Sequence, residues 1–216
     1  MDWVDVKNKG VSHYGLQPSL LPLDSIRFDV FHVRCAVTRR MMNSLRKFIL
    51  QQTVDVIQEF SKEVLSLFWS DYNILVWLLN KSFQSLIGSE LLQFIKHIPQ
   101  VVNFLKDKFH TTEFIQHLRE GLLLFQKITP FLVISTIDNI EEYKKEMSEF
   151  NKNIKLFYNA GKHTFLTKNV SSPGDDETFY LHCLRFYIPH IAEVTLKKHN
   201  LGVGIFTMQG LKRHNK

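Results

Sequence analysis

The chain has 216 residues, a mass of 25.4 kDa and a formal net charge of +6, with 44% hydrophobic and 22% charged residues. This length suffices to bury roughly 70% of the unfolded surface in one core, and the composition excludes an intrinsically disordered chain. The sequence predicts no membrane span and no signal peptide, because no apolar run approaches eighteen residues and the N-terminus lacks an apolar segment. Two cysteines without a disulfide framework indicate a reducing compartment, so we expect an intracellular location, with the nucleus as one such compartment.

Three segments are predicted along the chain. Residues 1–33 form a turn-rich lead-in with a short strand-like run at Ile26–Phe31, and residues 34–200 form a helical domain. Residues 201–216 form a terminal strand, Gly202–Phe206, and the start of a further helix. The predicted fold class is therefore mainly α, a helical bundle with short strand-like segments near both ends.

The helical pattern begins with an apolar stripe over residues 37–49, opposite a basic stripe on the same helix. Residues 69–88 are apolar nearly all round and are predicted to be buried. Thr111 or Thr112 is a candidate N-cap for the helix that ends near Pro130, and Asp138 with Glu141 fits a capping box for the next helix. An amphipathic helix after Pro189 is expected to stop at Lys-Lys-His-Asn, residues 197–200.

Positive charge is concentrated near the two ends of the chain. Residues 30–54 and residues 194–216 each carry a charge of +5 and contain no acidic residue. This distribution favours a polyanionic partner, and solvated helix faces remain the alternative interpretation. The candidate DNA-binding residues are Arg39, Arg40, Arg46, Lys47, Lys197, Lys198, Arg213 and Lys216.

The C-terminal residues carry a resemblance to a known family. After the expected strand, Gly210, Asn215 and Lys216 fit the pattern Gly-x-Glu-x-x-Asn-Lys, with Lys212 at the glutamate position. This segment resembles the end of the catalytic core in the large subunit of the V(D)J recombinase and in Transib-like transposases, which are RNase H-like enzymes. The stretch from Asp24 to Val30 is similar to the point where that family enters its helical insertion.

The resemblance implies a protein without the family's catalytic activity. In the family, both catalytic aspartates lie upstream of the matching region, and Lys212 replaces the third carboxylate. Two-metal catalysis requires carboxylates, and an ammonium about 4 Å from a divalent ion costs several kcal/mol at an effective dielectric near 20. We therefore expect a transposon-derived, inactive fragment of a DDE-type transposase that retains non-specific DNA-backbone binding and needs no cofactor. The alternative is a helical protein–protein interaction module without a nucleic-acid role.

Two further expectations concern metal binding and self-association. His32 with Cys35, and His182 with Cys183, are a candidate two-His two-Cys zinc set, with His190 as a further candidate ligand. Asp29 precedes this set and is interpreted as a carboxylate at a strand end or an N-cap, with a metal ligand as the alternative. The apolar face of the terminal strand, formed by Val203, Ile205 and Phe206, is expected to lack a partner and to promote self-association.

Overall fold

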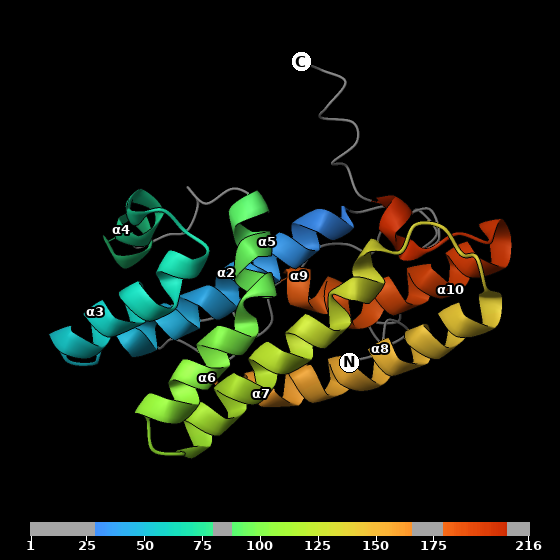
Figure 1. The fold of residues 1–216 in the computed structure, drawn as a ribbon. Helices are drawn as coiled ribbons and strands as arrows, with labels where there is room; N and C mark the ends of the chain where they lie inside the picture. Colours follow the sequence, from blue (N-terminus) through green and yellow to red (C-terminus); the bar gives the residue numbers. More distant parts are fainter. Residues whose placement is uncertain (1–28, 80–87, 166–178, 207–216) are drawn as a thin grey trace, which may run out of the picture.

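The computed structural model describes residues 29–79, 88–165 and 179–206, and it confirms the mainly helical fold (Figure 1). The α-helices are α2 (Val30–Ile49), α3 (Val54–Glu63), α4 (Asp71–Leu79), α5 (Gly88–Lys96), α6 (Ile98–Lys108), α7 (Glu113–Ile128), α8 (Ile140–Lys162), α9 (Phe179–His182) and α10 (Ile188–His199). Shorter elements are the 3-10 helices η2 (Leu65–Leu67), η4 (Pro130–Val133) and η6 (Val203–Phe206), and the π-helical turn η5 (Cys183–Tyr187). None of the helices in these ranges is both long and apolar enough to cross a membrane.

Helix α2 crosses the middle of the bundle, with α3 and α4 near one end and α10 near the other (Figure 1). Its N-terminus is capped by Asp29, whose carboxylate accepts hydrogen bonds from the amides of Phe31 and His32. The predicted boundary between residues 33 and 34 falls inside this helix. Val37, Met41, Leu45 and Ile49 of the apolar stripe are buried, as its spacing predicts, and Phe48 is half-buried.

Helices α7 and α8 form an antiparallel pair, joined by η4 (Figure 1). Thr112 caps α7, because its hydroxyl accepts a hydrogen bond from the amide of Ile115. The cap of α8 is Asn139, whose side chain accepts bonds from the amides of Glu141 and Glu142. The predicted capping box therefore begins one residue too early, since the asparagine side chain satisfies the first-turn amides itself.

Aromatic rings fill much of the core, in keeping with the eighteen phenylalanines of the chain. Phe125 and Phe157 join α7 to α8 with ring centroids 5.5 Å apart, and Phe165 packs 5.0 Å from Phe157. Near α4, the buried Phe60 and Trp77 rings lie 5.9 Å apart. Truncation of such a ring to alanine costs about 3–5 kcal/mol, so these contacts hold the helices in their positions.

The segment from α9 to α10 is one continuous helical run with a π-helical turn in it. Pro189 lacks an amide hydrogen and cannot make the ordinary bond to the carbonyl of Arg185. The extra residue of η5 accommodates this loss, and the amide of Ile188 bonds the carbonyl of Cys183 instead. The helix ends where predicted, with Asn200 in the left-handed region at φ 54°.

The predicted strands are absent from the described residues. Val30 and Phe31 belong to the first turn of α2, Asp29 is its N-cap, and residues 26–28 lie outside the described ranges. At the other end, η6 is a 3-10 helix, and an isolated antiparallel bridge joins Thr136 to Leu201 just before it.

The terminal apolar segment is packed rather than exposed, which overturns the premise of an unpartnered strand. Val203 is fully buried and its amide donates to the hydroxyl of Tyr143, while Phe206 packs against the core. The amide of Gly204 donates to the carbonyl of Ile134 at 2.7 Å, which brings η6 directly against η4. Only Ile205 of the three predicted apolar residues is exposed. The segment is covered because η4, far away in sequence, supplies its partner surface.

Candidate functional site

The basic stripe of α2 lies where predicted, and two of its arginines bond the carbonyls of other segments. Arg39, Arg40 and Arg46 are half-buried, and Lys47 is exposed. The guanidinium of Arg40 donates from Nε to the carbonyl of Phe165 at 2.8 Å. This bond ties α2 to the residues that follow α8, so Arg40 has a structural role.

Arg46 caps the C-terminus of α4. Its Nε donates to the carbonyl of Trp77 at 2.6 Å, and its Nη2 donates to the carbonyl of Leu78 at 2.7 Å. These carbonyls belong to the last turn of α4, where helical carbonyls have no partner within the helix. Burial lowers the pKa of the Arg46 guanidinium from its ordinary value. Two nitrogens of the planar guanidinium thus bond two carbonyls at once in a fork, an arrangement that the single ammonium of a lysine does not reproduce.

The second basic cluster lies far from the first. Lys197 and Lys198 are exposed in the last turn of α10, where cations also stabilise the helix dipole. The C-terminal ends of α2 and α10 lie at opposite ends of the bundle, so the two clusters do not form one continuous surface (Figure 1). Lys212, Arg213 and Lys216 lie outside the described residues.

The predicted zinc set is not assembled. His32 pairs with Asp29, with 2.5 Å between Nδ1 and Oδ2, and His190 is exposed on α10. Cys35 and Cys183 are free and buried, and burial raises the pKa of both thiols, that of Cys183 to about 12. No metal-ligating group found in the described ranges combines three of the residues His32, Cys35, His182, Cys183 and His190. Helical geometry separates His182 from Cys183, because consecutive side chains on a helix point in different directions.

Helix α4 is not amphipathic, because large apolar side chains lie on both of its faces. Ile74 and Trp77 are buried against the core. Tyr72, Leu75 and Leu79 are exposed by 72%, 52% and 71%, respectively. The expectation that residues 69–88 are buried all round is therefore wrong for α4, and residues 80–87 lie outside the described ranges. The helix sits at the edge of the bundle and has only one side to pack (Figure 1). We call Tyr72, Leu75 and Leu79 the α4 face.

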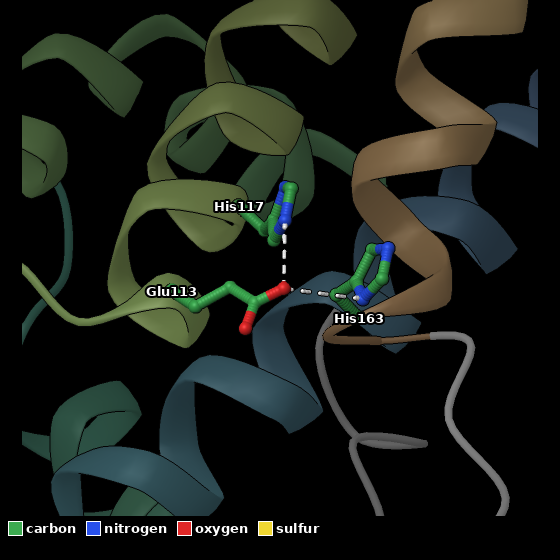
Figure 2. Close-up of side chains that lie close together, drawn as sticks. All are labelled: Glu113, His117 and His163. Atoms are coloured by element: carbon green, nitrogen blue, oxygen red, sulfur yellow. Dashed lines mark ion pairs between the residues drawn. The ribbon is translucent and has the colours of Figure 1, made fainter.

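A second feature, missed by the sequence analysis, is a cluster of two histidines and one glutamate between α7 and α8. Figure 2 shows Glu113 and His117 on the first turns of α7, facing His163 at the end of α8. One potential ligand atom of each residue lies within 4.8 Å of those of the other two. The spacing Glu113-x-x-x-His117 signals half of this cluster, because residues four apart share a helix face. Nothing local to the sequence connects His163 to it.

Comparisons with protein-family models, with curated proteins and with solved structures find no match. The resemblance to the V(D)J recombinase and the transposases therefore stays a prediction.

Proposed function

We propose that this chain is a helical protein-interaction module that inserts the α4 face into an apolar groove of a partner protein. The observation that carries the proposal is the exposure of three large apolar side chains at positions i, i+3 and i+7 of one helix. This spacing is the one by which a helix anchors itself in a hydrophobic groove. Burial of each such side chain stabilises a complex by about 1.5–3 kcal/mol before the costs of association.

The fixed position of α4 supports the same proposal. Trp77 and Ile74 anchor its inner face, and the fork from Arg46 holds its last turn. A helix that is already formed and oriented loses little conformational entropy on binding, which favours affinity. The α4 face therefore has the character of a pre-organised binding surface, whereas a single exposed apolar residue on a protein surface needs no explanation.

Photo-crosslinking tests this proposal. A photo-reactive amino acid at Tyr72 is expected to crosslink one protein in cells, and a second change, Leu75→Glu with Leu79→Glu, is expected to abolish that crosslink. The matched control places the photo-reactive residue at Leu156, an exposed apolar position on α8. The double variant should keep the far-UV circular dichroism and unfolding midpoint of the unaltered chain, because both leucines are exposed. Equal crosslinking from Leu156, or crosslinking that survives the double variant, contradicts the proposal.

Contact with nucleic-acid backbone is a second candidate function, in keeping with the resemblance to transposases. Fewer of the candidate residues are available for this role than the sequence suggests, because Arg40 and Arg46 donate hydrogen bonds to backbone carbonyls of the chain itself. Of the candidate DNA-binding residues in the described ranges, Lys47 and Lys197 are exposed. Two phosphate contacts predict a log–log salt slope of about −1.8 for binding to duplex DNA, against about −4.5 for five contacts. A flat salt response, or no binding at low salt, excludes this candidate.

A further inference from the structure

We propose that Glu113, His117 and His163 bind a zinc ion that joins the first turns of α7 to the C-terminus of α8. Glu113 is the first residue of α7, and His117 follows one turn later on the same face. His163 is the C-terminal cap residue of α8. Because α7 and α8 run antiparallel, these two helix ends meet, and the three side chains converge from both sides of the junction (Figure 2).

The distances in the cluster come close to those of a zinc site. Oε1 of Glu113 lies 3.7 Å from Nε2 of His117 and 4.0 Å from Nδ1 of His163. In tetrahedral zinc sites, bonds of about 2.0–2.1 Å place neighbouring ligand atoms about 3.3 Å apart. The Glu113–His117 and Glu113–His163 distances exceed this spacing by about 0.4 and about 0.7 Å, and rotation about side-chain torsions supplies such a change without movement of the helices.

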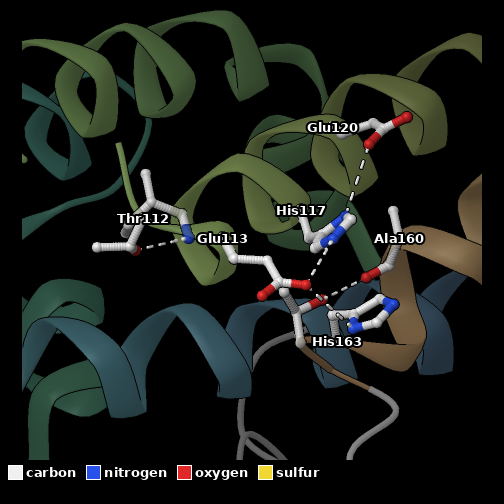
Figure 3. Close-up of polar contacts among 8 residues, drawn as sticks. Thr112, Glu113, His117, Glu120, Ala160 and His163 are labelled. Atoms are coloured by element: carbon white, nitrogen blue, oxygen red, sulfur yellow. Dashed lines mark hydrogen bonds and ion pairs between the residues drawn. The ribbon is translucent and has the colours of Figure 1, made fainter. Parts of the chain in front are cut away.

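His117 is oriented as a metal-binding histidine is. Its Nε2 faces Glu113, while its Nδ1 lies 3.7 Å from Oε2 of Glu120 on the next turn of α7 (Figure 3). A carboxylate beside the second ring nitrogen favours the tautomer that leaves the first nitrogen free to bind a metal, and it fixes the ring orientation. Nδ1 of His117 is also buried without a hydrogen-bond partner. If the ring moves slightly toward Glu120 when a metal binds, Nδ1 donates a hydrogen bond to the carboxylate of Glu120 and is no longer without a partner.

The rings of His117 and His163 are stacked, with centroids 4.3 Å apart and planes at 15°. Two imidazoles cannot bind one ion while parallel, because each nitrogen lone pair lies in the plane of its own ring. Metal binding therefore requires one ring to turn. His163 is the ring that turns, because its side chain is 53% exposed, whereas that of His117 is held between α7 and α8.

The donor set selects the kind of metal. Two imidazole nitrogens and one carboxylate oxygen form the ligand set of zinc sites that keep a fourth position for water. Magnesium and calcium prefer oxygen donors alone, which makes them poor competitors for two histidines. Zinc is the ion to which we commit.

Helices α7 and α8 approach closely beside the cluster because a small residue of each helix, Gly121 and Ala160, lies about one turn from it. A Cβ atom at Gly121 would stand 3.8 Å from Cβ of Ala160 and 2.9 Å from the Phe165 ring. This close approach sets the separation of α7 and α8 next to Glu113 and His163. The framework of the site therefore depends on helix packing and not on the metal, and the fold should persist without zinc.

Zinc titration of the full-length chain, first stripped with a chelator, tests the proposal. We expect one zinc ion per chain by calorimetry, and visible absorption of bound Co²⁺ typical of four or five ligands. When free zinc exceeds Kd about a hundredfold, the unfolding midpoint should rise by about 5–10 °C. Stronger binding of Cu²⁺ than of Zn²⁺ is expected from the general affinity order, whereas Mg²⁺ should not compete.

Variants decide whether the bound ion occupies this cluster. His117→Ala and His163→Ala are expected to abolish stoichiometric binding, and Glu120→Gln should weaken it about 10–100-fold through the loss of ring orientation. His32→Ala and His190→Ala are matched controls, since both remove an exposed histidine from the zinc set predicted from the sequence. Glu113 and His163 are exposed, so their variants should fold. The proposal is overturned by an absence of binding, by binding that survives His117→Ala or His163→Ala, or by its loss in either control.

Discussion

Replacement of Arg46 by methionine is the sharpest test of the structural role assigned to this arginine. Methionine keeps most of the apolar stem but removes the two hydrogen bonds to the carbonyls of Trp77 and Leu78. A hydrogen bond from a charged donor contributes about 1.5–3 kcal/mol, and two bonds of one group are less than additive. The released carbonyls lie at a helix end where water can reach them in part. We therefore expect a loss of about 2–3 kcal/mol in the free energy of unfolding.

The measurement is urea unfolding followed by tryptophan fluorescence. Trp77 is buried within α4 and Trp69 is buried next to it, so local loosening of that helix should shift their emission to longer wavelength before the whole chain unfolds. For a chain of this size, the expected loss lowers the thermal midpoint by roughly 4–12 °C. An Arg46→Lys variant should recover only part of the stability, because one ammonium cannot reproduce the fork.

Lys47 provides the matched control. It is the next residue of the same helix, carries the same charge and is exposed, so Lys47→Met should change stability by less than about 0.5 kcal/mol. If α2 contacts nucleic acid, Lys47→Met is expected to weaken duplex binding without loss of stability. Equal stability of the Arg46→Met and Lys47→Met variants refutes the capping role of Arg46.

Two further predictions concern the buried regions. Gly204→Ala should lower the free energy of unfolding by about 2–3 kcal/mol in urea titrations, because its Cβ would stand 2.6 Å from the backbone of Val133; a neutral effect would show that η6 does not pack on η4. Burial raises the pKa of the Cys183 thiol from 9.0 to about 12, so the folded state holds this proton more tightly than the unfolded chain. Its contribution to stability is therefore complete below about pH 9 and is lost as the pH rises toward 12. A Cys183→Ala variant should show a shallower decline over that range, and an identical decline contradicts the assignment.

Much of the secondary structure can be predicted from the sequence. The apolar stripe of α2, the hydroxyl cap at Thr112 and the helix stop at Asn200 all lie where local rules place them. These features depend on interactions among residues a few positions apart, which the sequence displays directly. The mainly helical class follows from the same local information.

Features that depend on distant neighbours required the tertiary structure. The same terminal apolar pattern suits a strand or a short helix, and contact with η4 decided that Val203–Phe206 forms η6. The exposure of the α4 face likewise reflects the place of α4 at the edge of the bundle.

The charges show the division most clearly. Arg46 and Lys47 are adjacent positively charged residues, and nothing in the sequence distinguishes their roles. In the structure, Arg46 donates to the carbonyls at the end of α4 and caps that helix, whereas Lys47 is exposed. His163 stands beside His117 because α7 and α8 pack antiparallel, although 46 residues separate them. The local sequence determined which segments are helices, through bonds between near neighbours. Packing of helices far apart in the chain decided which side chains meet, because that depends on three-dimensional proximity that no local pattern encodes.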